Sequence, residues 1–322
     1  REGVLVTGSV RGEGGILLNV KGERFMKEYD PVKMELGTRD VVARAIFNEI
    51  IQGRGTKNGG VWLDISHKSK DFIEKKLPKM ISKFKDFADV DITKEKMEVA
   101  PTAHYAMGGL RVDVETGHSN VNGLFAAGEV VAGVHGANRL GGNSLIDILV
   151  FGKSTGKGAA KYIGNKKRQN IPTNVVRQEE LRLNEPFGRK GVRPIIIKKK
   201  LQEIMWSNVG IVRNRKSLEK ALREIRVIKR KVKNISVGGS RIYNHEWIQH
   251  IDILAMIPVC EAVIRSALFR KESRGAHYRT DYKNKDDKMW LRNILVRLNI
   301  GKINLFTGIV PKIPSRLTRL LK

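Results

Sequence analysis

The chain has 322 residues, 41% of them hydrophobic, so it can bury a sizeable core and is expected to form two or more domains. Its single cysteine, Cys260, excludes an internal disulfide framework and a cysteine-ligated iron–sulfur cluster within the chain. The formal net charge is +28 at pH 7, and no apolar run is long enough to predict a transmembrane helix.

Residues 1–30 alternate apolar and polar positions and carry glycines, which predicts strands and tight turns. A helix is expected from Thr38, because Thr38 can cap it and Asp40 falls in its first turn. The segment 59–66 is typical of a buried strand. Helical spacing of apolar residues predicts another helix over 71–88.

Beyond residue 97 the sequence becomes extended and rich in turns. An apolar strand is expected to end at Glu129, and a helix is expected from Ser144. Prolines and mixed charges over 165–200 indicate a linker. Apolar stripes then predict two long amphipathic helices, over 200–232 and 245–271.

The charge distribution admits three explanations: nucleic-acid binding, a field that attracts small anions, or a lysine-rich or thermophilic proteome. Acidic residues are interspersed through most of the chain, which argues against nucleic-acid binding. No acidic residue follows Asp287, however. The segment 288–322 is therefore expected to be a basic tail that contacts an acidic partner or an anionic membrane.

Three short clusters carry candidate functional residues. "TGSVRGEGG" places Thr7 and Arg11 among glycines that permit close backbone approach, with an Arg11–Glu13 pair in a turn as the structural alternative. It lacks the spacing of a dinucleotide fingerprint. Arg39 lies at a helix start, where pairing with Asp40 is the alternative. His104 lies between two turns, where a hydrogen-bonded core histidine is equally expected.

The fourth cluster is "VHGANRLGGNSL", residues 134–145, where a glycine-rich loop leads into a helix. Its N–H groups and the positive end of the helix dipole would face a ligand. Glu129 is placed to accept hydrogen bonds from ribose hydroxyls. None of the four clusters has metal-ligand spacing.

Five of these residues are donors suited to an anion with two carboxylates: Thr7, Arg11, Arg39, His104 and Arg139. The glycines and Glu129 suit a large flat cofactor. A dicarboxylate held against a flavin is the chemistry that accounts for both sets.

Six motifs in the first 160 residues resemble, in order, the succinate dehydrogenase and fumarate reductase flavoprotein subunits and the related L-aspartate oxidase. They read "RGEGGILLN", "ELGTRDVVARAI", "LDISHK", "PTAHYAMGG", "GLFAAGEV" and "HGANRLGGNSL". The resemblance continues at "LQEIMWSNVGI" and "ESRGAHYRTDYKNKDD".

The resemblance implies an α/β fold: an α+β capping portion, part of an FAD-binding domain and an all-α helical domain. The chain would begin inside the capping domain, and the amino-terminal FAD fingerprint would lie outside it. The implied order is capping portion 1–96, carboxy-terminal part of the FAD-binding domain 97–165, linker 166–199, helical domain 200–287 and basic tail 288–322.

The resemblance also assigns roles. Arg39 matches the arginine that transfers the substrate proton, and Arg11 an arginine of the proton relay. The dicarboxylate would be held by Thr7, His104 and Arg139. FAD would be bound by Glu129, Asn138, Ser144 and Leu145.

The departure is Gly8, where the family usually carries a glutamate that links the two arginines. Proton delivery would then use water, Glu13 or another route.

The implied activity is FAD-dependent interconversion of fumarate and succinate, with electrons exchanged with an iron–sulfur partner subunit. L-aspartate oxidase is one alternative. An inactive fragment or a basic anion-binding protein is the other. We expect a cytoplasmic protein that binds no nucleic acid, with association at the inner face of the cell membrane through the partner as an option.

Overall fold

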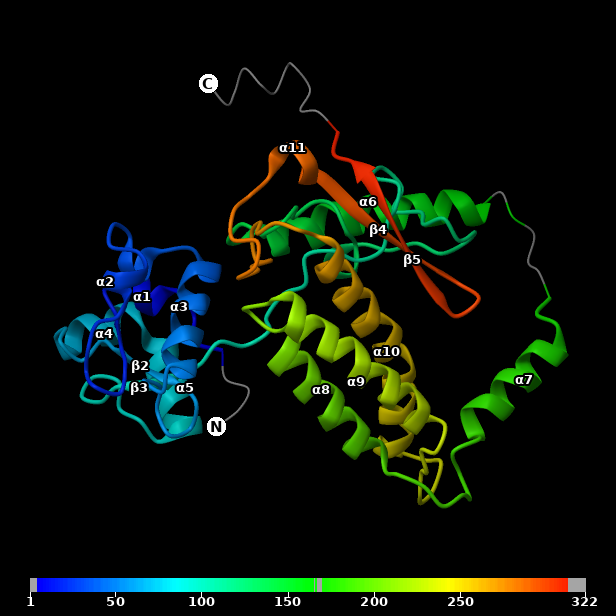
Figure 1. Ribbon diagram of the computed structural model, residues 1–322, viewed down its shortest axis with the longest axis horizontal. Helices are drawn as coiled ribbons and strands as arrows, with labels where there is room; N and C mark the ends of the chain where they lie inside the picture. Colours follow the sequence, from blue (N-terminus) through cyan, green and yellow to red (C-terminus); the bar gives the residue numbers. More distant parts are fainter. Residues whose placement is uncertain (1–4, 165, 167–169, 312–322) are drawn as a thin grey trace. The chain divides into compact units, whose positions relative to one another are not determined.

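The computed structural model describes residues 5–164, 166 and 170–311 of a chain that divides into two compact units, residues 1–106 and 107–322 (Figure 1). Each unit has its own core and is described by itself. Unit 1 mixes a sheet with helices, and unit 2 is mainly helical. This architecture confirms the predicted fold class.

Unit 1 is built on a three-stranded antiparallel sheet of β1 (Ile16–Leu18), β2 (Val61–Asp64) and β3 (Met97–Val99), in that order. Leu17 pairs with Leu63, which also pairs with Met97, and all three side chains are buried. The strand predicted over 59–66 is confirmed as β2. This row of buried side chains is the floor of the unit's core.

Short helices precede the sheet and connect its strands. They are α1 (Ser9–Gly12), α2 (Met26–Tyr29) and the 3-10 helix η1 (Met34–Leu36). The prediction of strands and turns over residues 1–30 is thus wrong at α1 and α2, which are single helical turns too short to produce a helical period in the sequence.

Helix α3 (Arg39–Ile51) confirms the helix expected from Thr38, although the Thr38 side chain accepts no capping hydrogen bond. The single helix predicted over 71–88 is two helices, α4 (Lys70–Lys76) and α5 (Pro78–Ala88). Pro78 begins α5 because proline suits a first helical position and cannot continue a preceding helix.

Unit 2 begins with an irregular segment that contains the 3-10 helix η2 (Gly128–Val130). The strand predicted to end at Glu129 is absent from this described segment, and only isolated bridges such as Leu110 to Val131 occur. Helix α6 (Asn143–Gly164) follows, which confirms the helix expected near Ser144. Only Asp147 of this long helix is buried.

Three helices form the core of unit 2: α8 (Pro194–Val209), α9 (Arg215–Val232) and α10 (His245–Phe269), which pack side by side (Figure 1). The apolar stripe of α9 is confirmed by buried Leu218 and Ile225. The stripe expected on α10 is wrong, because its members Ile248 and Val259 are exposed and α10 buries another face that carries Ile253. The single helix predicted over 200–232 is wrong, because Asn214 starts a new helix at a capping box with Ser217.

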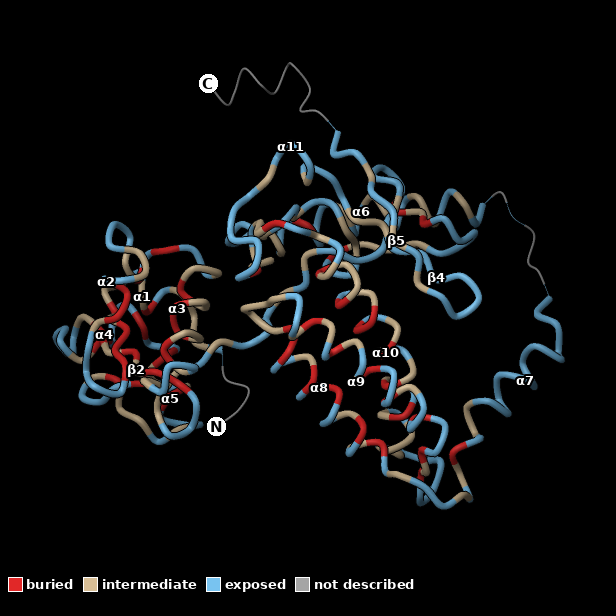
Figure 2. The backbone as a smooth tube through the Cα atoms, viewed as in Figure 1, coloured by how far each residue is buried: buried red, intermediate tan, exposed pale blue. Residues whose placement is uncertain are grey.

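The segment expected to be a linker, 166–199, contains α7 (Thr173–Asn184) and the start of α8. α7 and much of α6 are exposed along their length (Figure 2). The expected basic tail carries the end of α11 (Asp287–Trp290) and an antiparallel hairpin of β4 (Arg292–Asn299) and β5 (Lys302–Ile309); its residues 312–322 lie outside the described ranges. Within those ranges, we find no helix whose length and hydropathy would suit a membrane crossing.

Candidate functional site

Thr7 and Arg11 line the same small cavity in unit 1, which has a volume of about 110 Å³. Thr7 lies two residues before α1, and Arg11 lies on that helix. The rest of the wall is apolar and includes Leu17 and Val42. The structure therefore brings one hydroxyl and one guanidinium together beside the apolar core.

The guanidinium of Arg11 is held by main-chain carbonyls of the turn that precedes α3. Arg11 Nη1 donates to the oxygen of Glu35 at 2.5 Å and to that of Gly37 at 3.5 Å. Arg11 is thus anchored to this turn, and not through the pair with Glu13 that was the structural alternative. Since α3 begins at Arg39, the turn lies immediately before the second candidate arginine.

The pKa of Arg11 is lowered, first by burial of the guanidinium and then by the positive charge of Arg39. The nearby charge of Glu35 opposes this shift. Arg39 is exposed, and Asp40, the alternative partner of Arg39, pairs with Arg44 at 3.0 Å. The positive charge of Arg39 therefore acts on the guanidinium of Arg11.

His104 lies in the extended segment at the end of unit 1 and is exposed. This location differs from a hydrogen-bonded core histidine, the alternative considered from the sequence. An exposed imidazole is available to a ligand.

Unit 2 carries the remaining candidates, of which Asn138 and Arg139 lie on the glycine-rich loop before α6. Asn138 and Arg139 are half-buried there, and Arg139 Nη1 donates to the Leu140 oxygen at 3.2 Å. A Cβ on Gly136 or Gly142 would meet no atom of the described residues within 4 Å. Both have positive φ, 54° and 81°, so the loop needs glycine for its conformation and leaves open space beside it.

Ser144 and Leu145 lie in the first turn of α6, at the positive end of the helix dipole, which favours a negatively charged ligand. Leu145 is 65% exposed, so it can form an apolar contact with a bound molecule. Glu129 is exposed on η2, which corrects its expected place at the end of a strand. An open glycine loop, a long helix's N-terminus and an exposed apolar side chain fit a cofactor with phosphates and a flat ring.

Two contacts that sequence reasoning missed hold this loop in place. His135 Nε2 lies 3.2 Å from Asp147 Oδ2, and each side chain is only 5% exposed. From the other side, the N–H of Ala276 donates to the Ala137 oxygen at 3.1 Å. The second contact joins the loop to the motif "ESRGAHYRTDY", and only the folded chain brings the two together.

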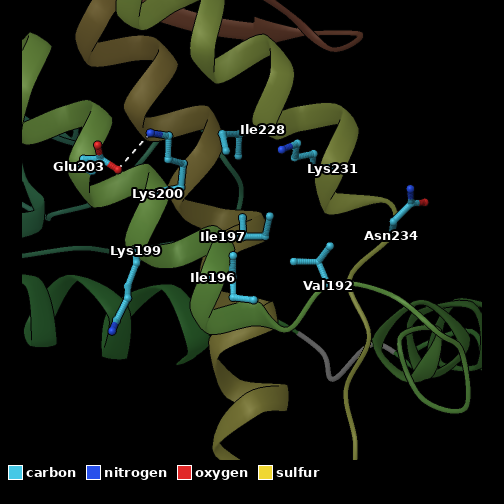
Figure 3. Close-up of a pocket in the computed structure, with 9 residues that line it drawn as sticks. All are labelled: Val192, Ile196, Ile197, Lys199, Lys200, Glu203, Ile228, Lys231 and Asn234. Atoms are coloured by element: carbon cyan, nitrogen blue, oxygen red, sulfur yellow. Dashed lines mark hydrogen bonds and ion pairs between the residues drawn. The ribbon is translucent and has the colours of Figure 1, made fainter.

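A larger groove of about 840 Å³ lies on unit 2 between the start of α8 and the end of α9 (Figure 3). Its lining is apolar, with Ile197 and Ile228, and lysines surround it; Lys200 pairs with Glu203 at 3.0 Å. None of the nine candidate residues lines this groove. Within the described ranges no cluster of histidine, cysteine and carboxylate side chains is arranged to hold a metal ion.

Comparison with known families gives two matches that follow one another along the chain. Residues 1–145 match the family "FAD binding domain", and residues 198–306 match "Fumarate reductase flavoprotein C-term".

Among curated proteins, a chain of the fumarate reductase (CoM/CoB) of Methanothermobacter marburgensis is 50% identical over 296 residues. The match covers 92% of this chain and 53% of the relative. The fumarate reductase flavoprotein subunit of Mycobacterium tuberculosis is 38% identical over 316 residues, with 91% of this chain and 54% of the relative covered. The chain spans about half the length of these relatives.

Solved structures of related proteins also superimpose on this chain. Sdh1 of Mycobacterium smegmatis, in complex with UQ1, superimposes with a TM-score of 0.87 at 40% identity, over 99% of this chain and 54% of that chain. A variant of the Escherichia coli quinol fumarate reductase gives a TM-score of 0.89 at 31% identity, over 97% of this chain and 57% of that chain.

Proposed function

Since this chain belongs to the family of fumarate reductase and succinate dehydrogenase flavoprotein subunits, we propose that it carries the dicarboxylate and proton-transfer residues of an enzyme that interconverts fumarate and succinate. FAD is the cofactor of this family. The observation that carries the proposal is the seat of the Arg11 guanidinium on the main-chain oxygens of Glu35 and Gly37, in the turn that leads directly to Arg39.

Proton transfer is the role proposed for the two arginines. Arg39 gives a proton to, or takes it from, a central carbon of the substrate, and Arg11 exchanges it onward. An arginine is a poor acid in water because its pKa is above about 12. Burial of Arg11 and its like-charged neighbour lower that barrier, since both disfavour the protonated form.

Substrate binding is proposed for Thr7, His104 and Arg139. A hydroxyl, an imidazole and a guanidinium can each donate to a carboxylate, and a guanidinium can do so through two parallel hydrogen bonds. Such donors stabilise negative charge that develops on the substrate as it reacts.

Cofactor binding is proposed for Glu129, Asn138, Ser144 and Leu145, and FAD, when bound, supplies the hydride chemistry. The open space at the glycines of the loop and the exposed Leu145 support this assignment. The start of α6 supplies N–H groups for an anionic part of the molecule.

We further propose that residues 1–96 belong to a capping domain, 97–165 to the FAD-binding domain and 200–287 to a helical domain. The matches at 1–145 and 198–306 support this order. An iron–sulfur subunit is the proposed electron partner, and it would bring the protein to the cytoplasmic face of a membrane. The electron partner and the membrane location would be tested by purifying the complex from its native source. EPR spectroscopy should then show iron–sulfur clusters that become reduced when succinate is added.

The complete protein that contains this chain is expected to oxidise a reduced viologen dye when fumarate is added. Arg39→Ala should lower this turnover by roughly 100-fold or more and leave flavin bound, because it removes the proton donor and not the cofactor contacts. Arg44→Ala, one turn along the same helix and paired with Asp40, is the matched control and should retain turnover. Substantial turnover of Arg39→Ala would contradict the acid assignment. Peroxide production from L-aspartate, without fumarate reduction, would identify an L-aspartate oxidase instead.

A further inference from the structure

Glu35 is a buried carboxylate in the turn that holds the guanidinium of Arg11 and leads into Arg39. We propose that Glu35 is a positioning residue for Arg11 and Arg39, and that it serves in place of the carboxylate that position 8 lacks. The inference rests on the proposed function, because it concerns how the same proton-transfer pair is held.

Position 8 faces the guanidinium of Arg11 but contributes no side chain. A Cβ built on Gly8 would lie 3.7 Å from Arg11 Nη2, and no other described atom lies within 4 Å of it. Gly8 has φ of −63°, which any residue adopts, so the glycine is not required by the backbone. A carboxylate there would be adjacent to Arg11, and in this chain Arg11 must be held in another way.

The turn at residues 35–37 provides the alternative. Both main-chain carbonyls that accept from Arg11, those of Glu35 and Gly37, belong to it. Gly37 is packed tightly, since an added Cβ would lie 2.9 Å from an oxygen of Asp30. The same turn leads into Arg39, so anything that fixes the turn fixes the distance between the two arginines.

The side chain of Glu35 fixes the turn at residues 35–37. The residue is 3% exposed, and its carboxylate accepts from Arg24 Nε at 3.0 Å, from Arg24 Nη2 at 2.6 Å and from the Leu17 N–H at 3.1 Å. These bonds join the turn to strand β1 and to the segment before α2. Glu35 therefore links the seat of Arg11 to the sheet of unit 1.

The charge of Glu35 also acts on Arg11, where it opposes the lowering of the pKa by burial and by Arg39. Burial opposes ionisation, but the hydrogen bonds from Arg24 and the Leu17 N–H outweigh it, so the pKa of Glu35 is lowered and the group is ionised at neutral pH. The charged groups that act on Arg11 are Arg39, which lowers its pKa, and Glu35, which raises it. Glu35 thus sets both the place of Arg11 and part of its proton affinity.

The test uses the complete flavoprotein and the variant Glu35→Gln, which keeps the shape of the side chain and removes its charge. We expect the rate constant kcat for fumarate reduction to fall by roughly 10-fold or more and KM to change by less than about 2-fold, because proton delivery is disturbed and substrate binding is not. The basic limb of the pH–rate profile should move to lower pH, because the group that raises the pKa of Arg11 has gone.

Glu49→Gln is the matched control in the same unit. Glu49 is also fully buried and also paired with an arginine, Arg54, and accepts from Tyr29 at 2.9 Å. A purely structural role of Glu35 would make the two variants alike in turnover and pH profile, which would overturn the proposal. Arg24→Gln removes the hydrogen bonds from Arg24 to the Glu35 carboxylate, so kcat should fall to a smaller degree. This variant keeps the proposal testable if Glu35→Gln does not fold.

Gly8→Glu supplies the decisive comparison. Added to Glu35→Gln or to Arg24→Gln, it should restore kcat to within about 3-fold, because the new carboxylate adjoins Arg11 directly; added to Glu49→Gln, it should change nothing. If Gly8→Glu fails to restore kcat in both of these backgrounds, the proposal is overturned.

A second readout does not depend on turnover. In protein labelled with ¹⁵N-arginine, Glu35→Gln should speed exchange of the Arg11 side-chain N–H with water at least several-fold, and Glu49→Gln should not. If the wild type fails to reduce fumarate, the proposed function is wrong while this measurement still decides the role of Glu35; equal exchange in the two variants would overturn that role.

Discussion

Gly275 lies so close to Ala137 that a Cβ on Gly275 would stand 2.2 Å from the Ala137 carbonyl oxygen. Gly275 also has φ of +57°, a conformation that glycine adopts without strain. Ala137 precedes the two loop residues proposed to contact cofactor and substrate. The segment that follows α10 therefore holds the glycine-rich loop by a backbone contact that tolerates no side chain.

Gly275→Ala is expected to displace that loop. Beyond about 1 kcal/mol for a left-handed alanine, the variant must move Ala137 away, so flavin affinity should fall at least several-fold. Titration of the complete apoprotein with FAD, followed by flavin fluorescence, measures this. Gly188→Ala is the control, since Gly188 has φ of +73° with open space around it among the described residues. Equal flavin affinity in the two variants would contradict a role for the contact.

His277 is expected to make unit 2 sensitive to acid. Burial, and then the charge of Arg213, lower its pKa to about 4, and Arg213 Nη1 lies 3.0 Å from His277 Nδ1. A folded-state pKa below the unfolded value of about 6.5 means that the stabilisation is complete above pH 6.5 and is lost as pH falls through 4. The loss amounts to up to about 3 kcal/mol.

Urea unfolding followed by tryptophan fluorescence at several pH values would measure this dependence. His277→Gln should flatten the decline in the free energy of unfolding between pH 6.5 and 4. His245→Gln, at an exposed histidine at the start of α10, should leave the decline as it is. If the free energy of unfolding of His277→Gln declines as that of the wild type does, the decline is due to other titrating groups.

Glu261 joins α9 to α10. It is 6% exposed and accepts from Lys229 of α9 and from Arg265 of its own helix. Glu261→Gln should lower the free energy of unfolding by about 2 kcal/mol, less than a fully buried pair would lose, because the Lys229 and Arg265 side chains remain 38% and 33% exposed.

The comparison for this pair is Glu219→Gln, which removes an exposed pair with Arg215 on the outside of α9. Its effect should stay within about 0.5 kcal/mol. Equal losses in the two variants, measured by urea denaturation, would show that burial of Glu261 adds nothing.

Cys260 is expected to be unreactive in the native protein. It is 9% exposed within the helix bundle, and burial raises the pKa of its thiol to about 11. Since the thiolate is the reacting form, a disulfide reagent at pH 8 should modify it slowly, and at full speed only in denaturant. Rapid modification of the folded protein would indicate that α10 opens locally.

The sequence predicted those elements whose signals are local. The helix at α3 was predicted from its apolar face and the acidic residue in its first turn. The breaks at Pro78 and Asn214 also carry local signals, a proline and a capping residue, but the apolar period of the sequence continues across both of them. α1 and α2 could not be predicted, since a single turn leaves no period.

The candidate residues could be named from sequence motifs, but the residues that hold them in place could not. Glu35 holds Arg11 through a main-chain oxygen, and Asp147 meets His135 across a turn. Main-chain acceptors carry no residue signature. The contact between Ala276 and Ala137 joins two motifs that are distant in sequence, and only the folded chain brings them together.

Helix α6 has one further consequence. Leu145, Ile146, Leu149 and Val150 are each more than half exposed, so the first half of the helix leaves apolar residues on its surface. Its first turn is also the proposed contact for the cofactor. Anything that covers the helix, whether ligand or protein, favours the ordered form by its binding free energy. Ordering of α6 and occupation of the cofactor site are then linked equilibria, and a change that weakens one will weaken the other.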